Sequence, residues 1–159
     1  MARPGAIQRF AAEAERRGLA LEVREFPQGT RTAQDAARAI GCEVGQIVKS
    51  LVFVADGEVF VALTSGANRV DTGRLASVLG ATEVRKATAD EVRDATGFAI
   101  GGTPPFGYPR PARVVVDRDL LAYEEVWAAA GTPMAVFPIA PGDLLRAAGA
   151  EPADFREEG

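Results

Sequence analysis

One of the two lysines in this chain stands where a charged side chain is costly. Of the 18 basic residues 16 are arginines, and Lys49 lies inside the apolar run Ile-Val-Lys-Ser-Leu-Val-Phe-Val at residues 47–54. A buried cation is unfavourable unless it is paired or lines a cavity, and lysine supplies a compact point charge rather than a planar fork. Lys49 is therefore a candidate site residue, although an outward-facing position on an amphipathic strand fits the same pattern. Lys86 fits a solvated surface charge.

A second candidate is the glycine- and proline-rich segment at residues 97–107, Gly-Phe-Ala-Ile-Gly-Gly-Thr-Pro-Pro-Phe-Gly. The adjacent Gly101 and Gly102 can adopt backbone conformations closed to other residues and let a ligand approach main-chain N–H groups. Pro104 and Pro105 stiffen the segment, which lowers the entropy lost on binding. The segment is neither a Walker A loop nor a GxGxxG turn. It fits a ligand-binding loop or an ordinary connection.

Weaker candidates lie elsewhere in the chain. The polar turn Ser65–Asn68 fits the border of a cleft or a plain turn. Asp117 and Asp119 resemble a carboxylate pair, but their spacing suits turn capping equally well. Trp127 fits a core position.

The residue types that are missing exclude several chemistries. The chain has no histidine and a single cysteine, Cys42. Ser-His-Asp and Cys-His catalysis, histidine metal sites, disulfide frameworks and zinc–cysteine clusters are therefore excluded. Cys42 itself fits a small buried apolar residue. We expect neither a cofactor nor a metal ion.

Charge and length also limit the possibilities. The net charge is −4 without a basic cluster, so we expect no DNA partner and no tight binding to duplex nucleic acid. No run of 18 apolar residues occurs, and Met1–Gly5 lacks the apolar core of a signal peptide, so we expect a cytoplasmic protein without a membrane partner. The 159 residues fit a single domain over 1–159.

Hydrophobic periodicity, capping residues and glycines predict helices and strands along the whole chain. Asp56-Gly57, between two apolar runs, predicts a tight hairpin. Residues 124–130 fit a helix by propensity, and residues 151–159 fit a polar tail. The other predicted elements are helices over 7–14, 33–40, 72–79, 88–95 and 141–148, strands over 21–24, 47–54, 59–63, 114–117 and 134–137, and an irregular segment over 97–111.

Lys49 and the Gly-Gly-Thr-Pro-Pro stretch, in this order, resemble the YbaK/prolyl-tRNA-synthetase-associated domain family, whose members hydrolyse mischarged aminoacyl-tRNA. The resemblance spans nearly the whole chain. It implies an α+β fold: a single domain with a mixed, mostly antiparallel sheet curled into a partial barrel and helices packed outside. It also favours a strand over 125–130 in place of a helix, and we adopt the strand.

The resemblance implies the positions of a site. Lys49 would face Gly101 and Gly102 across a cleft that takes the 3′ acceptor end of aminoacyl-tRNA. Lys49 would position or neutralise either the phosphate of the terminal nucleotide or the reacting ester, and the backbone N–H groups of the two glycines would polarise the ester carbonyl. A synthetase is a possible second partner. The implied substrate-binding residues are Thr32, Ser50, Ser65, Asn68, Ile100, Thr103, Pro104 and Ala130.

The sequence departs from some branches of that family. Ala129-Ala130-Gly131 and Val136 stand where the branch acting on cysteinyl-tRNA(Pro) resembles Ser-Gly-Gly followed by an acidic residue. Alanine, serine or another small residue is thus as plausible a substrate as cysteine. Two alternative functions stay open: a non-catalytic module that binds a nucleotide or an aminoacyl-tRNA end in the same cleft, and a hydrolase of a non-tRNA ester.

Overall fold

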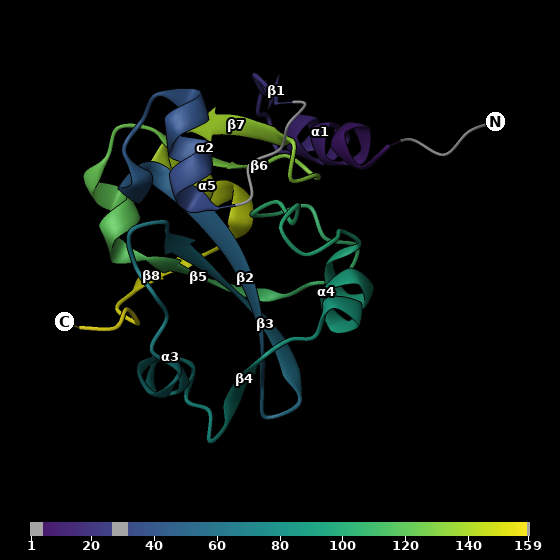
Figure 1. Cartoon of the computed structure of the whole chain (residues 1–159). Coiled ribbons are helices and arrows are strands. Elements are labelled where there is room, and N and C mark those ends of the chain that lie inside the picture. Colours follow the sequence, from purple (N-terminus) through teal and green to yellow (C-terminus); the bar gives the residue numbers. More distant parts are fainter. Residues whose placement is uncertain (1–4, 27–31, 159) are drawn as a thin grey trace.

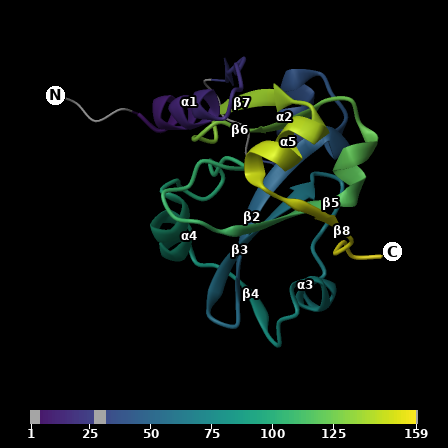
Figure 2. The same ribbon diagram turned by 180° about the vertical axis from the view of Figure 1, so that it is seen from behind.

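A computed structural model describes residues 5–26 and 32–158. In this part of the chain, five α-helices surround an eight-stranded mixed sheet (Figures 1 and 2). Helices α1, α2 and α5 lie with β6 and β7 at one end, and α3 lies with β4 at the other. The strands are β1 (Arg24–Glu25), β2 (Ile47–Ala55), β3 (Glu58–Ser65), β4 (Val84–Lys86), β5 (Arg113–Asp117), β6 (Val126–Ala129), β7 (Ala135–Ile139) and β8 (Glu151–Ala153).

The helices begin and end at the residues that capping rules select. Thr32 and Thr88 each accept a hydrogen bond from the third residue of their helix, and Gly41 and Gly97 close the same helices in the left-handed conformation. The helices are α1 (Ala6–Arg16), α2 (Ala33–Ile40), α3 (Thr72–Leu79), α4 (Ala89–Thr96) and α5 (Pro141–Ala148), with 3₁₀ turns η1 (Val44–Gln46) and η2 (Arg118–Ala122).

The sheet is open and truly mixed. Its order is β1-β7-β6-β2-β3-β5-β8, with β4 paired to β2 beside β6. The pairs β2–β6, β3–β5 and β5–β8 are parallel, and the other four described pairs are antiparallel. The sheet does not close into a barrel. Its outermost strands, β1 and β8, are short pieces that lie at opposite ends of the strand order.

Strand β2 divides the core. Val48 and Val52 pack into a cluster with Phe98 and Phe106, whereas Phe53 and Ala55 pack into a second cluster around α3. Alternation of side chains along a strand produces this division. Consecutive residues of β2 therefore reach different environments.

Several elements differ from the sequence-based predictions. The first strand comprises Arg24–Glu25 rather than residues 21–24, and β4 was not predicted. The expectation of a polar tail is wrong, because Glu151–Ala153 pairs with β5 and Phe155 is buried. The two buried apolar residues of this segment, Ala153 and Phe155, form too short a pattern to predict a strand, so the strand is recognised only from its pairing with β5. The strand expected over 125–130 is confirmed as β6.

Candidate active site

A cavity of about 380 Å³ opens at an incompletely paired edge of β2. On that edge β6 pairs with Ile47 and Val48, and β4 pairs with residues 53–55. Among the described residues, no strand covers 49–52 there, although the Ala87 N–H donates to the Val52 carbonyl at 3.0 Å. The lining comes from α2, β2, β4, α4, β6, β7 and the glycine loop: Thr32, Ala33, Ala36, Ile47, Val48, Lys49, Ser50, Leu51, Val52, Phe53, Lys86, Ala87, Val92, Ile100, Gly101, Thr103, Trp127, Ala128, Ala129 and Val136.

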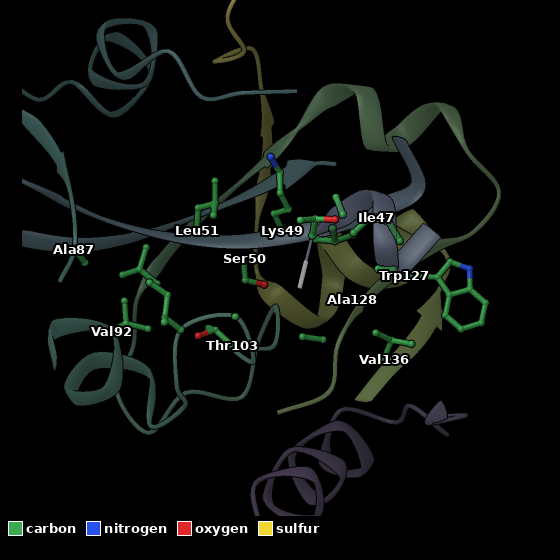
Figure 3. A pocket seen from close by; sticks show the side chains of 18 of the residues that line it. Ile47, Lys49, Ser50, Leu51, Ala87, Val92, Thr103, Trp127, Ala128 and Val136 are labelled. Carbon is green, nitrogen blue, oxygen red and sulfur yellow. The ribbon is translucent and has the colours of Figure 1, made fainter. Parts of the chain in front are cut away.

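The two polar residues of this edge point in opposite directions. Figure 3 shows Lys49 on one side of β2 and Ser50 on the other, where Thr103 and Val92 also lie. The expectation that the Lys49 ammonium faces the glycine loop is therefore wrong. Residue 49 belongs to the odd-numbered face of the strand, whereas the loop covers the even-numbered face.

The Lys49 ammonium is held by a turn that follows β3. Its Nζ donates to the Asn68 backbone carbonyl at 2.8 Å. Asn68 Nδ2 donates in turn to Asp117 Oδ2 and to Asp119 Oδ2, each at 2.8 Å. Burial lowers the pKa of Lys49, and the nearby charge of Arg69 lowers it further, while Asp117 acts in the opposite direction.

The side chain of Ser50 differs from that of Lys49 in its hydrogen bonding. Its Oγ is buried and has no hydrogen-bond partner among the described residues. The Val52 carbonyl points to the unpaired edge, and alternate residues of a strand point their backbone groups to the same edge. The backbone N–H and carbonyl of Ser50 therefore also face the gap. Thr103 Oγ1, nearby, donates to the Ala99 carbonyl at 3.1 Å.

The two glycines of the loop differ from each other. Gly101 is exposed, has φ of 84°, and occupies the third position of a turn closed by the Gly102 N–H donating to the Ala99 carbonyl at 3.0 Å. Because that N–H is already used, the expected role of Gly102 in polarising a substrate carbonyl does not fit. Gly102 instead permits close packing, since a Cβ there would lie 2.7 Å from Thr132 Cα.

The cavity brings together about half of the residues expected from the sequence. Lys49, Ser50, Gly101 and three others, Thr32, Ile100 and Thr103, line it. Ser65 and Asn68 instead belong to the network behind Lys49, whereas Gly102, Pro104 and Ala130 are buried beside the cavity without lining it.

Other lining residues were not selected from the sequence. Lys86 is exposed, as expected, yet it also lines the cavity. Trp127 is buried as a core residue, and Val92 and Val136 complete the apolar wall. Such residues carry only an apolar signal, which does not distinguish a cavity wall from a core.

Within residues 5–26 and 32–158, no three His, Cys, Asp or Glu side chains are grouped to hold a metal ion. Burial raises the pKa of the partly buried Cys42 thiol, which disfavours the nucleophilic thiolate. No described helix is both long and apolar enough to cross a membrane.

Comparisons with known proteins agree with this architecture. A crystal structure of a candidate trans-editing enzyme for prolyl tRNA synthetase is 48% identical and superposes with a TM-score of 0.92, covering 99% of this chain and 100% of that one. The uncharacterized protein YwhH of Bacillus subtilis is 30% identical over 124 residues, 77% of this chain and 78% of that protein.

A longer relative shares only one part with this chain. The proline--tRNA ligase of Nitratidesulfovibrio vulgaris is 33% identical over 105 residues, which are 65% of this chain and only 18% of the ligase. The profile of the aminoacyl-tRNA editing domain matches residues 27–147, well over half of the chain. This match covers the cavity and the network behind it, and the chain belongs to the aminoacyl-tRNA editing domain family.

Proposed function

We propose that this protein is a deacylase that acts in trans on mischarged aminoacyl-tRNA, hydrolysing the ester between a small amino acid and the 3′-terminal ribose. The observation that carries the proposal is the cavity at the unpaired edge of β2, in a chain of the editing-domain family. Its volume of about 380 Å³ and its apolar wall suit a small aminoacyl group. The candidate trans-editing enzyme matched over its full length supports action as a separate protein.

The geometry supports a division of the substrate between the two sides of β2. The acyl group lies on the Ser50 side, between the strand edge and the glycine loop. The backbone N–H and carbonyl of Ser50, which face the gap, are available to the α-amino and carbonyl groups of the substrate, as in the pairing of an added strand. Lys49, on the other side, is available to the phosphate of the terminal nucleotide.

Hydrolysis requires little from the side chains. A water oxygen adds to the carbonyl carbon, the bond to the ribose oxygen breaks, and the ribose oxygen leaves with a proton. An aminoacyl ester is already activated, so positioning and carbonyl polarisation accelerate this step without a side-chain nucleophile. The Gly101 N–H, at the open face of its turn, is the backbone donor proposed to polarise the carbonyl.

The test is a deacylation assay on a panel of mischarged tRNAs, including tRNA(Pro) charged with alanine, serine or cysteine. We expect turnover of at least one of them and no turnover of correctly charged prolyl-tRNA(Pro). If the protein binds a non-hydrolysable aminoacyl-adenosine analogue but hydrolyses none of the mischarged tRNAs, it is a binding module and not a deacylase. Turnover of simple esters alone would indicate a general esterase.

The partners follow from the same proposal. The net charge of −4 disfavours extensive contact with the tRNA body. We therefore propose that the protein reads the acceptor end and acts beside a synthetase in the cytoplasm, where tRNA is charged.

A further inference from the structure

A polar network behind Lys49 connects three segments that are distant in sequence. It links Lys49 on β2, the turn at Asn68 after β3, and Asp117 at the end of β5. Parallel pairing of β3 with β5, in the register Leu63 with Val116, places the ends of these strands side by side. Asp117 Oδ2 then accepts from the Ser65 N–H at 3.0 Å as well as from Asn68 Nδ2.

Asp117 is an unusual carboxylate because it is buried and forms no ion pair with any of the described residues. It is 3% exposed, and its described hydrogen bonds come from neutral donors: the Ser65 N–H, the Asn68 amide and the Asp119 N–H. Asp119, which shares the same Asn68 amide, is already paired with Arg156. The uncompensated negative charge of the network is therefore that of Asp117.

Lys49 is the cation that matches this charge. Its ammonium donates to the backbone carbonyl of Asn68, and the side-chain amide of the same Asn68 donates to Asp117. We propose that Asp117 is the positioning residue for Lys49: through Asn68 it fixes the carbonyl that orients the ammonium, and its charge keeps that ammonium in its cationic form. The role of Lys49 in catalysis rests on the proposed function, whereas its coupling to Asp117 does not.

The charges around Lys49 determine whether removal of the Asp117 charge raises or lowers the pKa of Lys49. Burial, Arg69 and Lys86 lower the pKa of Lys49, and Asp117 raises it. Asp119 and Arg156 face the network as a pair of opposite charges. Removal of the Asp117 charge therefore leaves only the effects that favour the neutral amine, and the pKa of Lys49 falls further.

Because the chain has only two lysines, the ammonium can be observed directly. NMR titration of protein labelled with ¹³C,¹⁵N-lysine yields two lysine side chains, and Lys86→Arg assigns the remaining one to Lys49. The experiment compares wild type, Asp117→Asn and Asp143→Asn. Asp143→Asn is the control for the loss of one carboxylate charge elsewhere in the protein: Asp143 lies on α5, where its side chain is 42% exposed and paired with Arg146.

We expect Asp117→Asn to lower the pKa of Lys49, and to move the alkaline limb of the deacylation rate to lower pH by the same amount. Asp143→Asn should leave both unchanged. An unchanged titration of Lys49 in folded Asp117→Asn would overturn the proposal. A purely structural role would lower the activity without moving the pH profile, and that result would also overturn it.

A second variant, Asn68→Ala, tests the same proposal if Asp117→Asn does not fold. Asn68→Ala removes the connecting amide from a partly buried turn and leaves the backbone carbonyl in the chain. We expect a lower pKa of Lys49 and a lower kcat, and no change in either would contradict the proposal. If wild type hydrolyses no mischarged tRNA, the proposed function fails, and the NMR titration still decides whether Asp117 controls Lys49.

Discussion

The two sides of β2 differ in how their polar groups are hydrogen-bonded, although residues of both sides line the same cavity. On the Lys49 side, the polar atoms are connected in a network that needs no ligand to complete it. On the Ser50 side, the wall is apolar and the buried hydroxyl lacks a described partner. Under the proposed function, the Lys49 side is organised before the substrate arrives, whereas the Ser50 side is completed by the substrate.

Removal of the ammonium should have the largest effect on activity. Lys49→Ala is expected to lower kcat/KM by about 100-fold or more, because a misplaced reacting group costs about that factor. Lys49→Arg should also be strongly impaired, since a planar fork does not replace a point charge beside the Asn68 carbonyl. Single-turnover deacylation, with the melting temperature as a control for folding, measures both. Near-full activity of either variant would exclude this role.

The glycine loop tests the opposite side of the cavity. Gly101→Val keeps the backbone N–H, but its side chain should prevent the substrate carbonyl from reaching that group, because Gly101 lines the cavity. We expect the rate to fall about 100–1000-fold, as after the loss of one carbonyl-polarising donor. A Cβ at Gly101 meets only Pro133 Cγ at 3.7 Å, so the main cost to stability is the positive φ, about 1–2 kcal/mol.

Gly102→Ala is the contrasting variant. The 2.7 Å approach to the Thr132 backbone predicts a loss of about 1–3 kcal/mol in the free energy of unfolding. Urea denaturation measures the free energy of unfolding of both variants, and the deacylation assay shows which of them loses activity while it remains folded. If folded Gly101→Val keeps wild-type turnover, the backbone donor lies elsewhere.

The buried hydroxyl sharpens the comparison because stability and activity should move in opposite directions. Ser50→Ala removes a buried hydroxyl that has no hydrogen-bond partner among the described residues, and it should raise the free energy of unfolding by about 1 kcal/mol. The same variant should lower kcat/KM by roughly 10-fold, the value of one hydrogen bond to substrate.

Ser65→Ala is the matched control for stability. Ser65 Oγ donates to the Gly45 carbonyl at 2.8 Å, so its loss should destabilise the protein by about 1 kcal/mol. Denaturation curves of both variants check the two signs. Destabilisation by Ser50→Ala would show that its hydroxyl has a partner in the folded protein.

The smallest expected effect is the dependence on pH. The pKa of Lys49 lies below its usual 10.5, so in the alkaline range the folded protein binds fewer protons than the unfolded chain. Stability contributed by this group therefore rises with pH between the two pKa values, while activity falls as the ammonium is lost. Denaturation and deacylation of wild type and Lys49→Met, followed over pH 8–11, test both trends. Parallel falls of stability and activity in wild type alone would contradict this linkage.

Much of the local structure was predictable because its causes are local. Capping by Thr32 and Thr88, the Asp56-Gly57 hairpin and the apolar run of β2 each depend on neighbours within a few residues. The singular position of Lys49 in an apolar strand was likewise visible in the sequence. The absence of histidine excluded whole classes of catalysis without any structure.

The tertiary structure decided which side each residue serves. Pairing of β6 and β4 at the two ends of β2 creates the open edge, and parallel pairing of β3 with β5 brings Asp117 to the turn at Asn68. Both depend on contacts between segments tens of residues apart, about which local periodicity carries no information. The sequence thus determined that Lys49 is unusual, whereas only the register of the sheet decided that it points to Asn68 rather than to the glycine loop.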